Sequence, residues 1–145
     1  MKIENFFSDT EKKAIQKAIA QAELNTSGEI RVHIDRVCSG DPVKSAIELF
    51  EQLDMHKTEL RNGVLFYLAL ETKKFAIVGD TGIDQVVPAN FWDSIKETVI
   101  THFKAQQFTE GLCEGIRMAG EKLKEHFPFQ KGDTNELSDE ISFQQ

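Results

Sequence analysis

The feature that most constrains the fold is the apolar run from Gly63 to Leu70, which reads GVLFYLAL. A run of this length is far too short to cross a bilayer as a helix, which needs about 20 residues. A short segment that is apolar on both faces is typical of a strand in the middle of a sheet, where both faces are covered. Asn62 and Gly63 introduce the run, so we expect a central strand to begin here.

Two further strands are predicted on either side of this run. Residues 29–35, EIRVHID, alternate strictly, with Ile30, Val32 and Ile34 on one face. Such alternation is typical of a strand with one face on the core. Residues 75–79, FAIVG, follow the polar segment ETKK, which predicts a β-hairpin with the central strand.

Helical periodicity and capping residues predict four helices. The residues expected to cap them are Ser8, Asp41, Asn90 and Thr109. Ser8 and Glu11 form a capping box, so the first helix should begin at Asp9. Asp41 is followed by proline at the first helical position. The buried stripe of this second helix is expected to comprise Val43, Ala46, Ile47, Phe50 and Leu53.

The element order is helix, strand, helix, strand, strand, helix, helix. This order predicts an α/β fold, a three-layer α/β/α sandwich with a small mixed β-sheet. The length of 145 residues suits one core, so we expect a single domain over residues 1–128. Residues 129–145 form a polar, acidic C-terminal tail, expected to be mobile or to dock loosely through Leu137, Ile141 and Phe143.

Strand directions predict which loops meet. A strand–helix–strand crossover makes the first two strands parallel, and the hairpin makes the third antiparallel to both. The segments 26–29, 61–63 and 79–84 then lie at the same end of the sheet. Asp35 falls at the opposite end.

This convergence predicts a carboxylate cluster of Glu29, Asp80 and Asp84, with Asn62 and Thr81 supplying neutral oxygens. Hard cations take oxygen ligands of this kind, so we expect a divalent cation, calcium rather than magnesium. Ser27 and Thr26 add further hydroxyl groups nearby. The alternative is that Glu29 faces solvent while Asp80 bonds the amides of a turn.

Several familiar motifs are absent or incomplete. Asp80-Thr81-Gly82 matches an aspartic-protease signature, but that chemistry needs two such aspartates and the chain has one copy. An EF-hand loop starting at Asp80 fails, because Gly82 lacks a third-position oxygen and Phe91 stands where a glutamate belongs. The sequence contains no phosphate-binding glycine loop, zinc-protease motif or nucleophile elbow.

The aromatic and histidine residues are expected to be structural. Trp92 stands at a helical spacing that is typical of core residues. Phe91 and Trp92 also follow the acidic loop closely enough to line one side of a crevice at the carboxylate cluster. The four histidines lack ligand spacing, so we expect them at the surface or at helix ends. His33, for example, lies on the strand face opposite the core stripe.

Charge and cysteine content limit the classes of function that the protein can have. A net charge of -7 with no Lys/Arg-rich run argues against nucleic-acid binding. Cys38 and Cys113 lack disulfide or zinc spacing and are expected to be reduced thiols. The start of the chain has no signal-peptide pattern. We therefore expect a cytoplasmic monomer without direct membrane insertion, acting alone or with an unknown protein partner.

With these residues assembled, the sequence resembles the TPM-domain family. The matching stretches are TSGEIRV, RNGVLFYLAL, FAIVGDTGID, the FW helix start, FTEGLCEGI and, in the tail, NELSDEI. The resemblance covers roughly residues 5–127. It implies an α/β/α fold with an acidic crevice that holds divalent ions, usually calcium. Some members of the family are described as acid phosphatases, and others have accessory roles in membrane-complex repair or receptor modulation.

Three functional hypotheses follow. The first is a divalent-cation-binding accessory domain whose ligands are the five residues named above. The second is a metal-assisted phosphomonoesterase, in which Asp80 acts as nucleophile or the metal activates a water. Arg61 is the cation near the acidic cluster that would contact phosphate in that case. The third is a non-catalytic scaffold, in which the carboxylates only cap turns.

Overall fold

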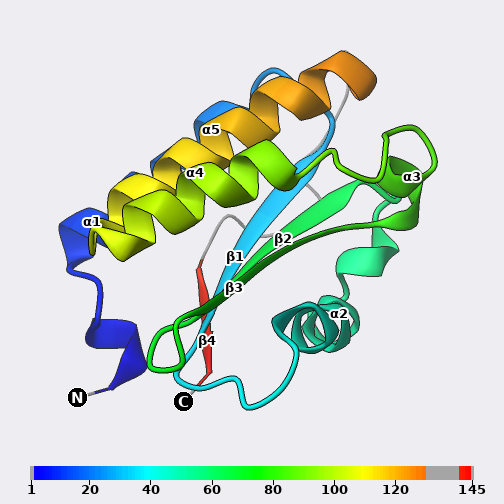
Figure 1. Ribbon diagram of the computed structural model, residues 1–145. Coiled ribbons are helices and arrows are strands. Elements are labelled where there is room, and N and C mark those ends of the chain that lie inside the picture. Colours follow the sequence, from blue (N-terminus) through cyan, green and yellow to red (C-terminus); the bar gives the residue numbers. More distant parts are fainter. Residues whose placement is uncertain (1, 130–140, 145) are drawn as a thin grey trace.

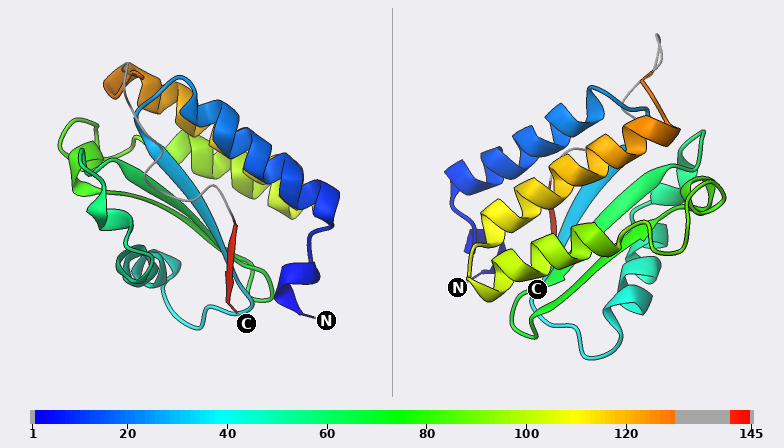
Figure 2. Two further views of the ribbon diagram at one scale, coloured as in Figure 1. Left: turned by 180° about the vertical axis from the view of Figure 1, so that it is seen from behind. Right: turned by 45° about the horizontal axis from the view of Figure 1, so that its top comes forward.

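The computed structural model describes residues 2–129 and 141–144. One four-stranded mixed sheet, in the order β3-β2-β1-β4, carries helices on both faces (Figure 1). The elements are η1 (Ile3–Asn5), α1 (Asp9–Glu23), β1 (Glu29–Asp35), α2 (Pro42–Gln52), η2 (Met55–Lys57), β2 (Gly63–Ala69), β3 (Lys74–Gly79), α3 (Thr81–Asp84), α4 (Asp93–Lys104), α5 (Phe108–His126) and β4 (Ser142–Gln144). Helices α1, α4 and α5 cover one face and α2 lies on the other (Figures 1 and 2). The predicted α/β/α sandwich is confirmed.

The predicted strand directions are confirmed as well. β1 and β2 are parallel, with Glu29 opposite Gly63. β2 and β3 are antiparallel, with Val64 opposite Gly79. The crossover through α2 and the tight hairpin after β2 therefore produce the mixed sheet that the element order requires. Residues at the start of β1, the start of β2 and the end of β3 lie at one end of the sheet.

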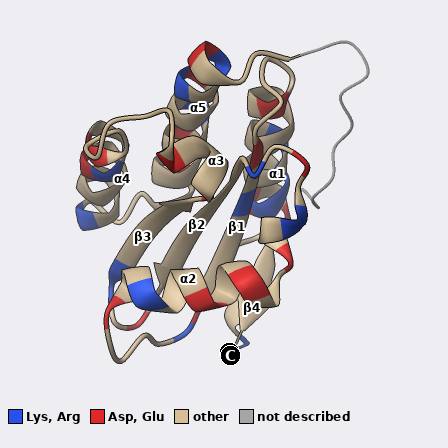
Figure 3. Cartoon of the chain, turned by 90° about the vertical axis from the view of Figure 1, so that its right-hand side faces the viewer, with Lys and Arg blue, Asp and Glu red and all other residues tan. Residues whose placement is uncertain are grey.

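The core has two parts, one on each face of the sheet. Ile30, Val32 and Ile34 of β1 are fully buried against α1 and α5. On the other face, Leu65 and Tyr67 of β2 pack with residues of α2. Every residue of β2 is buried, which confirms it as the central strand. In Figure 3 it carries no charged residue.

The buried stripe of α2 differs from the predicted one. Ala46, Leu49 and Phe50 are buried, whereas Val43 and Ile47 are 39% and 51% exposed. The helix packs on β2 and β3 rather than across the whole sheet. One flank of its apolar surface therefore faces outward, which periodicity alone does not reveal.

The helix starts follow the predictions in part. Ser8 and Glu11 form the capping box before α1, and Asp41 caps α2 by accepting from the amide of Val43. The predicted caps Asn90 and Thr109 are wrong, because α4 is preceded by Trp92 and α5 by Gln107. Asn90 instead accepts the amide of Asp93 through its carbonyl, and the hydroxyl of Thr109 donates to Glu11.

The last described residues form a strand that periodicity did not predict. β4 pairs in parallel with β1 and becomes the outer strand of the sheet (Figure 2). Ile141 and Phe143 pack against the larger part of the core, as expected if the tail docks. Leu137 lies outside the described residues, and the division of the chain at residue 128 stays a prediction. Within the described ranges, no helix is both long and apolar enough to cross a membrane.

Candidate functional site

The three loops predicted to converge do meet at one end of the sheet, here called the α3 rim (residues 26–29, 61–63 and 79–84). Backbone hydrogen bonds join each loop to the next one along this end of the sheet. The amide of Glu29 donates to the carbonyl of Asn62 at 3.3 Å, and the amide of Asp80 donates to the carbonyl of Gly63 at 3.0 Å. The convergence inferred from strand directions is therefore confirmed.

Gly82 permits the closest contact within the α3 rim. Its amide donates to the carbonyl of Arg61 at 2.9 Å. A Cβ atom at this position would lie 2.2 Å from the carbonyl oxygen of Leu60 and 2.6 Å from that of Arg61. Both are backbone atoms and cannot move aside as a side chain would. The short helix α3 is thus held against the loop before β2 by a contact that requires glycine.

Asp80 has two structural roles at this rim. Its Oδ1 atom accepts the amide of Thr81 at 2.7 Å, which caps α3. Arg61 also donates two hydrogen bonds to this carboxylate, from Nε to Oδ2 at 2.8 Å and from Nη2 to Oδ1 at 2.9 Å. The carboxylate is 4% exposed, whereas the guanidinium side chain is 46% exposed. Arg61 therefore neutralises a buried acid while remaining in contact with solvent.

Asp84 lies at the other end of α3 and is exposed. Partial burial, followed by the negative charge of Asp80, raises the pKa of the Asp84 carboxyl. The two carboxylates therefore repel each other across one turn of helix.

The other predicted ligands also lie at the α3 rim. Glu29 is 3% exposed, so the expectation that it faces solvent is wrong, whereas the other part of that alternative is confirmed, because Asp80 does bond the amide of Thr81. Asn62 is buried, and its Nδ2 atom donates to the hydroxyl of Ser27 at 3.4 Å. Thr81 is exposed at the first position of α3. The structure thus places the five predicted residues at the same end of the sheet.

Their donor types suit a hard cation, but their arrangement is incomplete as a binding site. Among the residues that the structure describes, no group of three or more His, Cys, Asp or Glu side chains is placed to hold a metal ion. Both oxygens of Asp80 are bonded to Arg61. A cation at this rim would have to replace the guanidinium and draw on neutral oxygens and water.

The aromatic pair beside the acidic loop belongs to the core instead of lining a crevice. Phe91 and Trp92 are only 7% and 9% exposed and pack edge to face at 4.6 Å between ring centroids. A Cβ on Gly79 would lie 3.0 Å from the indole ring of Trp92. Trp92 thus supports the end of β3, directly before Asp80.

The histidine prediction is wrong for His33. This residue is 3% exposed and bonds to Asp35 and to Ser142 of β4. It was expected at the surface because it faces away from the larger core. The neighbouring strands bury it on that second face, and no spacing in the sequence signals the contact with β4. Arg61 was likewise noted near the acidic cluster, but its pairing with Asp80 joins positions 19 residues apart.

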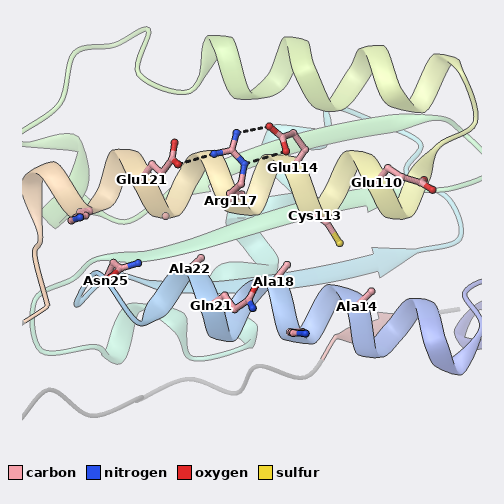
Figure 4. A pocket seen from close by; sticks show the side chains of 13 residues that line it. Ala14, Ala18, Gln21, Ala22, Asn25, Glu110, Cys113, Glu114, Arg117 and Glu121 are labelled. Carbon is pink, nitrogen blue, oxygen red and sulfur yellow. Dashed lines mark hydrogen bonds and ion pairs between the residues drawn. The ribbon is translucent and has the colours of Figure 1, made fainter.

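A separate groove of about 630 Å³ lies between α1 and α5 (Figure 4). Small side chains such as Ala18 and Ala22 line it from α1. From α5, Arg117 lies over it, bonded to Glu114 and Glu121. These two acids neutralise the arginine, and none of the predicted site residues reaches the groove. The α3 rim is therefore the better candidate for a functional site.

The mixed sheet with helices on both faces makes this chain a small three-layer α/β domain. The sequence profile of one family of such domains, described as the TPM domain, matches residues 2–122. The chain therefore belongs to the TPM-domain family. No functionally curated protein matches the chain.

The solved structures that are similar to this chain include three NMR structures. The NMR structure of the BA42 protein from the psychrophilic bacterium Bizionia argentinensis shares 45% sequence identity, covers 99% of both chains and superimposes with a TM-score of 0.92. The N-terminal domain of a P. gingivalis protein has 18% identity and a TM-score of 0.70 over 87% of this chain and 82% of its own. The N-terminal domain of cg2496 from Corynebacterium glutamicum has 14% identity and a TM-score of 0.67, over 92% and 82% of the two chains. The last two likenesses concern the fold alone.

Proposed function

We propose that this protein is a divalent-cation-binding TPM domain that uses the α3 rim as its binding site. The observation that carries the proposal is the meeting of the loops that hold Glu29, Asp80 and Asp84 at one end of the sheet, joined by backbone hydrogen bonds. Asp80 and Asp84 stand at the two ends of a four-residue helix, where partial burial and then the charge of Asp80 raise the pKa of Asp84. A doubly charged cation between them would relieve their mutual repulsion more fully than the single charge of Arg61.

The proposed ligands are the carboxylates of Asp80 and Asp84, with Glu29 and the neutral oxygens of Asn62 and Thr81 in support. Calcium fits this set better than magnesium, because it accepts six to eight oxygens in flexible geometry. The set relies on neutral groups and water, so we expect a Kd on the order of 10⁻⁴ to 10⁻³ M. The residues of this chain bind and position the ion, and no chemical step is assigned to it.

Arg61 makes the proposed site responsive. Its backbone is held by the amide of Gly82, but nearly half of its side chain is in solvent. The guanidinium can therefore swing out while the loop stays in place. Two apolar side chains next to the rim in sequence are exposed, Leu60 at 49% and Val86 at 52%. This surface supports an accessory role, in which the ion-bound rim contacts a protein partner.

A metal-assisted phosphomonoesterase is the second candidate, and Arg61 is the observation that favours it. A guanidinium freed from Asp80 would offer a bidentate contact to a phosphate beside the cation. Both its Nε and Nη2 groups donate to Asp80 in the structure. This activity therefore depends on cation binding, which must be established first.

The test is a calcium titration of the wild-type protein followed by amide chemical shifts. We expect saturable shifts concentrated at residues 80–84. Asp80→Asn should abolish these shifts, and Asp84→Asn should weaken binding on the order of tenfold, since affinity depends on the number of charged ligands. Asp93→Asn is the matched control, because Asp93 is an exposed acid in the first turn of α4.

Two outcomes would contradict the proposal. Unchanged ion binding in both Asp80→Asn and Asp84→Asn would place the ion elsewhere on the protein. Absence of any response in the wild-type protein would leave the carboxylates as turn caps and favour the scaffold hypothesis. A parallel titration with magnesium tests the preference for calcium.

A further inference from the structure

A series of partly buried hydrogen bonds joins three strands at the opposite end of the sheet. The imidazole of His33 lies 2.7 Å from the hydroxyl of Ser142 through Nδ1 and 2.7 Å from Oδ1 of Asp35 through Nε2. The hydroxyl of Tyr67 donates to the second carboxylate oxygen of Asp35 at 2.6 Å. The rings of His33 and Tyr67 are stacked, 6.1 Å apart. We call this end of the sheet, with β4, the β4 rim.

The outer strand β4 contributes Ser142 to these hydrogen bonds. β4 has three residues and pairs with β1 at one edge of the sheet. The amide of Arg36 donates to the carbonyl of Gln144 at 3.2 Å, and the ammonium group of Lys12 lies over the ring of Phe143. A three-residue strand at the edge of a sheet is the kind of element that opens before the rest of a fold.

Ser142 is placed to respond to the protonation of His33. When the imidazole is neutral, Nε2–H donates to Asp35 and the hydroxyl of Ser142 donates to Nδ1. When the imidazole is protonated, Nδ1–H donates to Ser142, and the hydroxyl must turn toward the carbonyl of Val32, 3.3 Å away. Ser142, His33 and Asp35 are hydrogen-bonded in the same order as the residues of a serine-hydrolase triad. The contact of Ser142 with the carbonyl of Val32, however, keeps the serine within the β1–β4 pairing.

The surroundings of His33 favour the neutral form. Burial lowers the pKa of the imidazole, and the opposing effect of Asp35 is smaller. Arg31, on the same strand, also lowers it. From β2 the neighbour is Tyr67, whose own raised pKa keeps it uncharged, and from β4 it is the neutral Ser142. Among the described residues, Asp35 is thus the one acid that faces the ring.

We propose that β4 is a detachable edge strand and that its docking on β1 weakens when His33 takes up a proton. The docked strand covers the imidazole and makes a positive charge there unfavourable. Release of β4 gives Nδ1 access to water, where the charged form is solvated. By linkage, protons therefore favour the released state.

The test is amide hydrogen exchange on the full chain between pH 5 and pH 8, expressed as protection factors. The reporter is the amide of Arg36, which donates to Gln144 of β4, and the reference is a central amide such as that of Leu65. In the wild-type protein we expect the protection of Arg36 to fall several-fold as the pH drops below 6.5, the ordinary value for histidine, while that of Leu65 stays constant.

Two variants separate this mechanism from general acid destabilisation. His33→Gln keeps a polar side chain without a titrating group, so the protection of Arg36 should become independent of pH. His126→Gln alters an exposed histidine at the end of α5 and should behave as the wild type. Ser142→Ala should lower the protection of Arg36 across the whole range, because the bond from β4 to His33 is lost.

Three results would overturn the proposal. One is a protection factor of Arg36 in the wild type that does not change with pH. Another is an equal pH dependence in wild type and His33→Gln. The third is protection of Arg36 equal to that of Leu65 under all conditions, because β4 would then open only when the whole domain unfolds.

Discussion

The two ends of the sheet each hold an acid paired with a base, and the pairs differ in where the base lies. At the α3 rim, Asp80 is buried and its partner Arg61 is 46% exposed. At the β4 rim, the base His33 is 4% exposed and Asp35 is 15% exposed. At the α3 rim, the acid is buried and its base is in contact with solvent. At the β4 rim, the base is the more buried member of the pair.

This difference determines what each pair can respond to. A guanidinium keeps its charge at any physiological pH, so Arg61 can be displaced from Asp80 only by a competing cation or by salt. An imidazole changes charge near neutral pH, so His33 couples its surroundings to protons. Under the two proposals, the α3 rim therefore exchanges its guanidinium for an ion, and the β4 rim responds to pH.

The largest expected effect is the loss in unfolding free energy caused by a glycine substitution, which tests how tightly each rim is packed. Gly82→Ala places a Cβ atom 2.2 Å from the carbonyl oxygen of Leu60, and we expect a loss of about 3 kcal/mol in unfolding free energy. Gly40→Ala, in the loop after β1, meets no atom within 4 Å and should change stability by less than about 0.5 kcal/mol. Urea unfolding measures both. If Gly82→Ala lowered the unfolding free energy as little as Gly40→Ala, α3 would not be held against the loop before β2.

The next effect compares the two acids. Asp35→Asn removes a charged acceptor from two buried donors, Tyr67 and His33, and should reduce stability by about 1–3 kcal/mol. Asp80→Asn should reduce it less, because Arg61 regains contact with water. Melting temperatures at about 0.05 M and 1 M salt should show a smaller Asp80→Asn effect at high salt, where the exposed guanidinium is screened. The Asp35→Asn effect should not change with salt. Equal salt sensitivity would contradict the contrast between the rims.

The smallest effect has the opposite sign. Asp84→Asn removes the repulsion from Asp80 and should raise the melting temperature of the ion-free protein by about 1–2 °C at neutral pH. The pKa of Asp84 is raised in the folded protein, so the destabilising contribution of the carboxylate is present at neutral pH and disappears as the pH falls below 3.8, the ordinary value. The two proteins should then melt alike in acid. Wild type more stable than Asp84→Asn at neutral pH would disprove the repulsion.

Local patterns were sufficient to predict much of the fold. The capping box before α1, the alternation in β1 and the doubly apolar β2 are each short-range signals, and the structure confirms all three elements. Strand directions then placed Glu29, Asp80 and Asp84 at one end of the sheet without any knowledge of side-chain contacts. The short helix α3 was missed, because four residues are too few to show a helical period.

The sequence by itself determined the layers, the mixed sheet, the family and the set of residues at the α3 rim. Only the tertiary structure decided which of those residues pair. Arg61 meets Asp80 across 19 residues, and His33 meets Ser142 across 109. No local pattern specifies such pairs, because they depend on how loops and the outer strand pack after the sheet has formed. For the same reason, the responses proposed for the two rims became visible only in the folded chain.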